Sequence, residues 1–209
     1  MNKKFEFTGE TKAILGNTLH RIRALISFGE VGAGELGGWI EKEENLDASG
    51  NAWVYGNAQV YGNAQVSGNA QVYGNACVYG DAWVSGNARV SGNARVYGNA
   101  RLSGNAWVCG NARVYGDARV DGDARVYKCG AIFWISNVGS RDDTATFFAC
   151  RDKKIKVIVG CFFGDLDEFA AAVQKTHGDN THAKVYRLAI EMAKERIKMD
   201  DMPEESNDG

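Results

Sequence analysis

The stretch from Asn51 to Tyr127 repeats one six-residue phrase, Gly-Asn-Ala-x-Val-Tyr/Ser. Taking valine as the marker, the phrase recurs at positions 54, 60, 66, 72, 78, 84, 90 and 96, then at Leu102, then at 108, 114, 120 and 126. A short fixed period is the signature of an architecture in which one small unit stacks on the next. This repeat therefore constrains the fold more than any other feature of the chain.

Alanine and valine are two residues apart in each unit, so in an extended segment they point to the same side. The x residue and the Tyr or Ser point outward, and Gly-Asn supplies the corner because both residues tolerate the left-handed backbone conformation. Such a unit cannot bury its Ala/Val side alone. Stacking solves this, because three units make a triangular turn of about 18 residues that pairs with the next turn. The repeat predicts a parallel β-solenoid.

Residues 18 apart support the three-unit turn. After valine, one column reads Tyr61, Tyr79, Tyr97 and Tyr115, and another reads Ser67, Ser85, Ser103 and Asp121. Turns of two or four units would scramble these columns. We expect one edge of the prism to carry a stack of tyrosine rings, which either fills the edge, forms a subunit contact or provides a platform for a ligand.

The outward x residues change along the repeat, from Trp53 and then glutamines to mostly arginines in the second half. The arginines are Arg89, Arg95, Arg101, Arg113, Arg119 and Arg125. When residues 18 apart are aligned, Trp107 falls between Arg89 and Arg125. At that position we expect its indole to pack between two guanidiniums. Like charges one strand apart repel. The arginines are therefore solvated, paired with carboxylates of a neighbouring subunit, or bound to a phosphate-bearing molecule.

The segments before the repeat predict a cap. Residues 4–26 read as a β-hairpin or two short strands, which would cover the unpaired edge of the first coil. An irregular first turn begins near Val31, with residues 34–36 in register with 52–54, and the acidic run 41–47 loops outward.

After Tyr127 the phrase decays, although Ile132 and Val138 keep its spacing, so we place the end of the solenoid at 138. Strands follow over 144–149 and 155–163. Asp165 to Glu168 has the form of a capping box and opens a helix to about Lys175. A second helix is predicted from Thr181 to about Met199. Its expected apolar side carries Val185, Leu188, Ala189 and Met192.

The expected organisation is mainly β. It comprises an N-terminal β cap with an irregular first coil (1–45), a β-helix (46–138), a small α+β C-terminal domain (139–199) and a disordered acidic tail (200–209).

The charge and the cysteine content indicate the compartment in which the protein works. The net charge of −2 gives no global field directed at nucleic acid or membrane, and no apolar run is long enough to cross a bilayer. The five cysteines are odd in number and form no Cys-x-x-Cys pair, and no apolar leader precedes them. We expect a reduced, cytoplasmic compartment.

Residues 46–138 resemble the left-handed hexapeptide-repeat helix of acyltransferases and gamma-class carbonic anhydrases, which implies a left-handed parallel β-helix. The chain departs from the sites of both families. The only histidines are His20, His177 and His182, so neither a coil-borne general base nor a three-histidine zinc site is present, and no loop is inserted in the repeat. The resemblance implies the fold and not the activity. We expect no catalytic residue, metal or cofactor.

Two polar clusters outside the repeat are candidate binding loops. The first contains Ser140, Arg141, Asp142 and Thr144, and its amides, hydroxyl and guanidinium suit a phosphate. The second contains His177, Asp179 and Asn180 at a helix start, where donors converge. As ordinary structure, they are a turn and an inter-helix loop with a capping residue. A Cys150 or Cys161 nucleophile is also conceivable, but both lie in predicted apolar strands, where buried thiols are inert.

Nearly the whole chain also resembles a family of phage and prophage proteins. These carry Gly-Asn-Ala-x-Val repeats followed by Gly-Ser-Arg, Gly-Cys-Phe-x-Gly and Thr-His-Gly-Asp-Asn motifs, here at 139–141, 160–164 and 176–180. A phage setting implies a small non-enzymatic protein that binds host immune nucleotide signals or host defence proteins.

The leading hypothesis is a non-enzymatic binding protein that sequesters an anionic, nucleotide-like ligand as a homotrimer in the cytoplasm of a bacterial host. The arginine-rich half of the repeat adds Arg101, Arg119 and Arg125 to the candidate ligand-binding residues. Two alternatives stay open: a hexapeptide-type acyltransferase, and a scaffold or inhibitor that binds a host protein.

Overall fold

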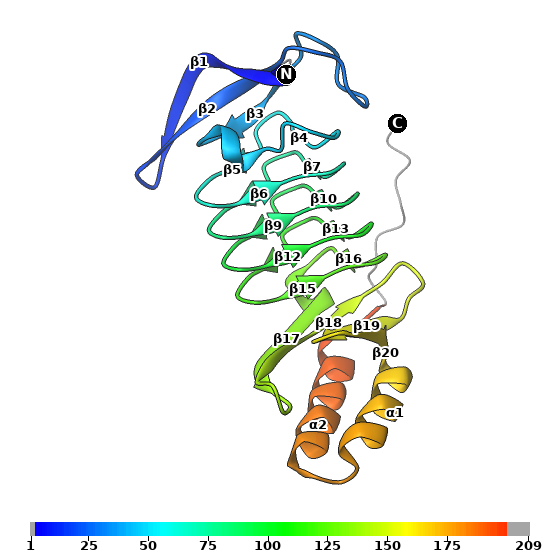
Figure 1. The fold of residues 1–209 in the computed structure, drawn as a ribbon. Coiled ribbons are helices and arrows are strands. Elements are labelled where there is room, and N and C mark those ends of the chain that lie inside the picture. The colour runs from blue at the N-terminus through cyan, green and yellow to red at the C-terminus, as the bar shows by residue number, and fades with distance from the viewer. Residues whose placement is uncertain (1–2, 200–209) are drawn as a thin grey trace.

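The computed structural model describes residues 3–199 and shows a mainly β fold built around a parallel β-solenoid (Figure 1). Val60 pairs with Val78, and Val78 with Val96, so the predicted turn of three units is confirmed. The repeat alanines and valines form the buried core. The strands are β4 (Trp53–Val54), β5 (Gln59–Val60), β6 (Gln65–Val66), β7 (Gln71–Val72), β8 (Cys77–Val78), β9 (Trp83–Val84), β10 (Arg89–Val90), β11 (Arg95–Val96), β12 (Arg101–Leu102), β13 (Trp107–Val108), β14 (Arg113–Val114), β15 (Arg119–Val120) and β16 (Arg125–Val126).

Glycine and asparagine have different roles at the corners of the coils. Gly74 has a φ of 69°, and a Cβ built on it would lie 3.0 Å from the amide nitrogen of Gly92 in the next coil. The repeat asparagines do not share the positive φ. Their side chains instead form ladders, in which Asn69 Nδ2 donates to Asn87 Oδ1 (3.0 Å) and Asn87 Nδ2 donates to Asn105 Oδ1 (3.1 Å). Glycine therefore makes the corner, and asparagine ties each corner to the next.

The tyrosine column forms as expected. Successive rings from Tyr61 to Tyr115 are stacked with centroids 5.0, 4.9 and 5.0 Å apart and planes within 8° of parallel. The spacing follows from the distance between adjacent parallel strands. The ring of Trp134 closes the column by meeting Tyr115 edge-on.

The N-terminal hairpin is confirmed as β1 (Phe5–Ile14) and β2 (Asn17–Ala24). It extends a solenoid sheet through β3 (Leu36–Ile40), which runs parallel to β5. Ile40 pairs with Val60, 20 residues away, so the expected 18-residue register of the first turn is wrong.

The short 3-10 helix η1 (Glu43–Asn45) accommodates the longer first coil. Asn45 Nδ2 donates to the carbonyl oxygens of Gly62 (3.0 Å) and Ala64 (2.8 Å). The acidic run therefore completes the first coil and does not loop outward.

Trp53 is also not outward-facing. Its side chain is fully buried, and the rings of Phe5 and Phe28 meet it edge-on at 6.3 and 5.3 Å. The N-terminal segment folds over this position, and a repeat considered in isolation cannot predict that cover.

The C-terminal domain is a four-stranded antiparallel sheet with two helices below it (Figure 1). Ile132 and Val138 both lie in its first strand, so their six-residue spacing does not continue the solenoid, whose last strand is β16. The elements are β17 (Ile132–Val138), preceded by η2 (Cys129–Ala131), β18 (Asp143–Ala149), β19 (Ile155–Val159), β20 (Phe162–Asp165), α1 (Leu166–His177) and α2 (Thr181–Arg196).

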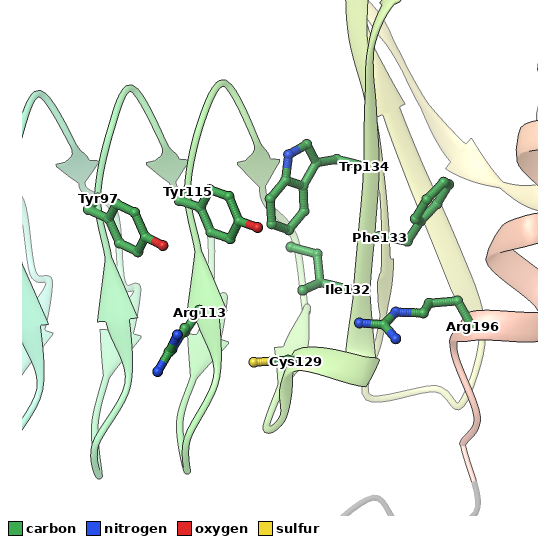
Figure 2. Close-up of a pocket in the computed structure, with 8 residues that line it drawn as sticks. All are labelled: Tyr97, Arg113, Tyr115, Cys129, Ile132, Phe133, Trp134 and Arg196. Atoms are coloured by element: carbon green, nitrogen blue, oxygen red, sulfur yellow. The ribbon is translucent and has the colours of Figure 1, made fainter.

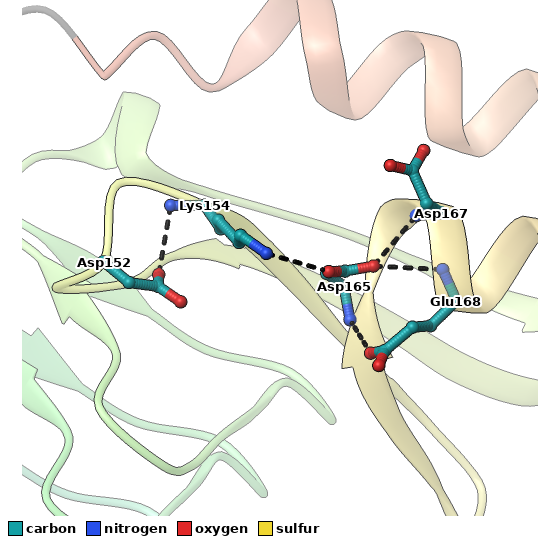
Figure 3. Close-up of polar contacts among 5 residues, drawn as sticks. All are labelled: Asp152, Lys154, Asp165, Asp167 and Glu168. Atoms are coloured by element: carbon teal, nitrogen blue, oxygen red, sulfur yellow. Dashed lines mark hydrogen bonds and ion pairs between the residues drawn. The ribbon is translucent and has the colours of Figure 1, made fainter.

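The capping box predicted at Asp165 is confirmed (Figure 3). Asp165 Oδ1 accepts from the amides of Asp167 (3.1 Å) and Glu168 (3.0 Å), and Glu168 Oε2 accepts from the amide of Asp165 (2.8 Å). Lys154 Nζ lies 3.3 Å from Asp165 Oδ2. These contacts fix where β20 ends and α1 begins.

The apolar side predicted for the second helix is only partly correct. Leu188 and Met192 are 66% and 53% exposed, whereas Tyr186 and Ile190 are buried. The helix turns its tyrosine side inward because Tyr186 packs edge-on against the ring of Phe169, at 5.2 Å.

Strand β18 covers the last coil. The amide of Arg119 donates to Thr146 Oγ1 (3.1 Å), Ala124 forms an antiparallel bridge with Cys150, and the amide of Arg151 donates to the carbonyl of Asp123 (3.0 Å). The domain thereby hydrogen-bonds backbone groups at the edge of the last coil, which could otherwise pair with strands of another chain.

The tail predicted at 200–209 lies outside the described residues. Neither helix within residues 3–199 is long and apolar enough to cross a membrane.

Candidate functional site

The two predicted binding loops both contribute residues to one pocket in the C-terminal domain. Ser140 and Arg141 come from the turn between β17 and β18, and His177 is the last residue of α1. The pocket has a volume of about 440 Å³ and is also lined by Phe162, Phe169 and Tyr186 among others. We refer to it as the Ser140–His177 pocket. It combines a few polar groups with apolar and aromatic walls, as small-molecule sites do.

Tyr186 forms the centre of the aromatic wall. Its ring lies 5.8 Å from that of His177, and the ring of His182, in the first turn of α2, lies 5.6 Å from that of His177. Burial raises the pKa of Tyr186, and the nearby carboxylate of Asp143 adds to the effect. Tyr186 is therefore a neutral phenol at physiological pH and is positioned to pack against an apolar ring.

A second pocket adjoins the first where the domain meets the solenoid. Arg101, Ser103, Arg119 and Asp121 line its solenoid side, and it has a volume of about 360 Å³. Both pockets include Gly160, Cys161 and Phe162, in the turn between β19 and β20. The turn therefore separates two adjoining spaces. We call this one the Arg101–Arg119 pocket.

Cys161 is exposed at that turn, contrary to the expectation of a buried thiol. Gly160, with a φ of 57°, turns the chain there. Cys150 is buried as expected, and burial raises the pKa of its thiol to about 12, which keeps it protonated and unreactive. The sequence pattern predicted Cys161 inside a strand; Gly160, directly before it, was the signal that could have indicated the turn.

The charged residues that line the two pockets carry a small excess of positive charge. Arg101, Arg119 and Arg141 outnumber the carboxylates of Asp121 and Asp143. Guanidiniums with exposed donors suit phosphate or carboxylate groups. The combined surface is therefore complementary to a small anion that also carries an apolar ring.

The remaining candidate residues have other contacts. Thr144 Oγ1 donates to Ser136 Oγ (2.9 Å), Asp179 pairs with Arg187 (2.9 Å), and Asn180 caps α2 by accepting from the amide of Ala183 (3.0 Å). Asp142 lies in the β17–β18 turn with a φ of 51° and does not line either pocket. Asn180 therefore has the capping role that ordinary structure predicted.

Arg125 also lies apart from both pockets. Its guanidinium lies 5.7 Å from the ring centroid of Trp107 and donates to the carbonyl oxygens of Asn105 and Ala124, both at 3.2 Å. Half of the predicted Arg–Trp–Arg sandwich thus forms, because only Arg125, and not Arg89, reaches the indole face.

No histidine lies on the repeat. His20 stacks on Phe7 in the N-terminal hairpin, with centroids 4.6 Å apart, and the other two histidines lie in the C-terminal domain. Within residues 3–199, no three His, Cys, Asp or Glu side chains gather in a way that would hold a metal ion.

Comparison with protein families agrees with this architecture. The family model described as the YdcK Beta solenoid repeat matches the coils, over residues 58–71, 70–86, 82–96, 88–104, 94–110, 106–122 and 112–128. The chain is a β-solenoid repeat protein. The matched segments end at residue 128, before the C-terminal domain that contains the Ser140–His177 pocket. No curated protein matches the chain.

Proposed function

We propose that this β-solenoid protein is a non-enzymatic binding protein that sequesters an anionic, nucleotide-like small molecule in the Ser140–His177 pocket. The observation that carries the proposal is the convergence of Ser140, Arg141 and His177 on one cavity. These residues come from separate parts of the chain, and the cavity walls include the rings of Phe162 and Tyr186. A ring of the ligand packs against the aromatic wall while Arg141 and Ser140 bind its anionic group.

The likeness to phage and prophage proteins supplies a biological setting for this proposal. In that setting the protein works in the cytoplasm of a bacterial host and withdraws a nucleotide signal of host defence. The solenoid serves as the platform, and a homotrimer of parallel prisms presents the pocket three times. The mass of the purified protein by light scattering tests the trimer independently of the ligand.

The test of the ligand is mass spectrometry of small molecules released by heating protein purified from bacterial lysate. We expect wild-type protein to release a phosphate-bearing compound, and Arg141→Ala and His177→Ala to retain much less of it. Arg89→Ala is the matched control, since Arg89 is an exposed arginine of β10 outside both pockets. Finding no released compound across many lysates, or equal retention by Arg141→Ala and wild type, would contradict the proposal.

A protein-binding role is the second candidate. The observation that favours it is the exposure of Leu188 and Met192 on one side of α2. Under this alternative a host protein covers that side, and pull-down with wild-type protein recovers a partner that Leu188→Lys loses. The acyltransferase hypothesis has less support, because His177 packs beside Tyr186 in the C-terminal domain and not on a coil.

A further inference from the structure

The junction between the solenoid and the C-terminal domain holds a third pocket, with a volume of about 460 Å³ (Figure 2). Tyr97, Tyr115 and Arg113 line it from the solenoid, Cys129 from η2, Trp134 from β17 and Arg196 from the end of α2. None of these residues belongs to the Ser140–His177 pocket. We call this third cavity the junction pocket.

Two flat aromatic walls meet in the junction pocket. Tyr115 is the last ring of the tyrosine column and is 42% exposed. Trp134 meets it at 4.6 Å with an interplanar angle of 89°. The regular stacking therefore stops at Tyr115, and the two rings form a corner. A planar group that stacks flat on one of these rings meets the other ring edge-on. Stacked and edge-on contacts are the two favourable geometries for aromatic pairs.

The charged side chains that line the junction pocket within residues 3–199 are both positive. Arg113 and Arg196 line it, and no carboxylate of this part of the chain does. Neither guanidinium forms an ion pair or side-chain hydrogen bond with another residue of the described chain. Figure 2 shows the Arg196 guanidinium directed toward Cys129 and the solenoid, with Arg113 on the opposite side of the cysteine. Two unpaired guanidiniums beside one cavity suit an anionic group, which would gain charge-assisted hydrogen bonds from both.

Arg196 is held at this place by the packing of the end of α2. Ile197 is buried, and the hydroxyl of Tyr127 donates to the carbonyl of Lys198 (3.1 Å). A Cβ on Gly130 would lie 3.9 Å from the carbonyl oxygen of Arg196, so the helix end rests against η2. The backbone that carries the guanidinium is therefore fixed against the solenoid.

From these observations we propose that the junction pocket is a separate binding site for a planar aromatic molecule that carries a phosphate or carboxylate group. The ring occupies the corner between Tyr115 and Trp134, and the anionic group lies between Arg113 and Arg196. This site does not depend on the Ser140–His177 pocket, and a ligand there would contact both the solenoid and the domain.

Phenyl phosphate is a direct probe, because it combines one ring with one phosphate. Its binding is followed through the indole N–H resonance of Trp134 in a ¹H–¹⁵N spectrum, assigned by its loss in Trp134→Phe. We expect a saturable shift with phenyl phosphate, and binding weaker by about tenfold or more with inorganic phosphate or benzamide, which each lack one of the two features.

Variants locate the site. Arg196→Gln and Arg113→Gln should each weaken phenyl phosphate binding by about tenfold, the loss of one charge-assisted contact. Arg89→Gln, an exposed arginine outside the pocket, and Arg141→Ala, in the Ser140–His177 pocket, should leave it unchanged. An unshifted Trp134 resonance, equal binding of benzamide, or an equal loss in Arg89→Gln would overturn the proposal. The Arg141→Ala result also separates this site from the function proposed above.

Discussion

A Cβ built on Gly139 would overlap the hydroxyl oxygen of Tyr186. Gly139 also has a φ of 76°, which L side chains rarely adopt. Two constraints therefore require glycine at this position of the Gly-Ser-Arg motif. Its φ is unfavourable for other residues, and the packed tyrosine leaves no room for a side chain. It sets the positions of Ser140 and Arg141 relative to the aromatic wall of the Ser140–His177 pocket.

Gly139→Ala should lower the free energy of unfolding by about 2–4 kcal/mol, the sum of backbone strain and overpacking. Urea unfolding measures the loss. In the Tyr186→Phe background the clashing oxygen is absent, so the same substitution should cost less. If Tyr186→Phe leaves the cost unchanged, the contact with the hydroxyl is not its cause.

The tyrosine column predicts a difference between losing a ring and losing a hydroxyl. Tyr97 stacks on both Tyr79 and Tyr115. Tyr97→Ala should lower the free energy of unfolding by about 2–3 kcal/mol, since each aromatic pair contributes about 0.5–1.5 kcal/mol beyond burial. Tyr97→Phe keeps both stacks and should stay within about 0.5 kcal/mol of wild type in the same urea titration. Equal losses in the two variants would show that the hydroxyl, and not stacking, stabilises the column.

The capping box gives a prediction about charge and pH. Hydrogen bonds from the amides of Glu168 and Asp167, together with Lys154, hold the pKa of Asp165 below its usual value. The stabilisation is therefore present above the ordinary aspartate pKa and is lost as the pH falls through the lower, folded-state value. Asp165→Ala should lower the melting temperature by about 2–4 °C at pH 7.

Asp165→Asn is the matched control, because asparagine also caps helices. It should melt closer to wild type than Asp165→Ala does, and its melting temperature should depend less on acid pH. Calorimetry at pH 7 and at pH 3 makes the comparison. Indistinguishable melting of wild type and Asp165→Ala at pH 7 would show that the cap does not stabilise the fold.

Lys4 predicts a pH dependence of the same sign as that of Asp165, but in an alkaline range. Its side chain is buried in the N-terminal cap and donates to the carbonyl oxygens of Ala52 (2.8 Å) and Asp47 (3.1 Å). Burial lowers its pKa from 10.5 to about 8, partly offset by Asp47. Between these values the unfolded chain still holds a proton that the folded chain has released, so the contribution of Lys4 to stability rises with pH in that window.

The measurement is the free energy of unfolding of wild type minus that of Lys4→Met, at pH 7.5 and at pH 10. The difference between the two proteins should move in favour of wild type at the higher pH. Taking this difference cancels the titration of the tyrosines, whose pKa values are raised by burial, to about 12 for Tyr61. A difference that moves toward Lys4→Met would contradict the lowered pKa.

The sequence determined the solenoid, its turn of three units, the tyrosine column and the capping box at Asp165. The solenoid features follow from the 18-residue period, because every coil contacts only its neighbours and residues 18 apart in the sequence are therefore in contact. The capping box follows from a four-residue motif. The sequence also singled out Ser140, Arg141 and His177, through the density of polar residues in two short loops.

Only the tertiary structure decided how the two ends of the solenoid are covered and which pockets the loops of the C-terminal domain form. The 20-residue first coil, the burial of Trp53 and the inward turn of Tyr186 all depend on segments outside the repeat. The meeting of Arg141 with His177 likewise depends on how α1 packs on the sheet, as the junction pocket depends on where α2 ends. No period encodes such contacts, because they join stretches of chain that have no common register.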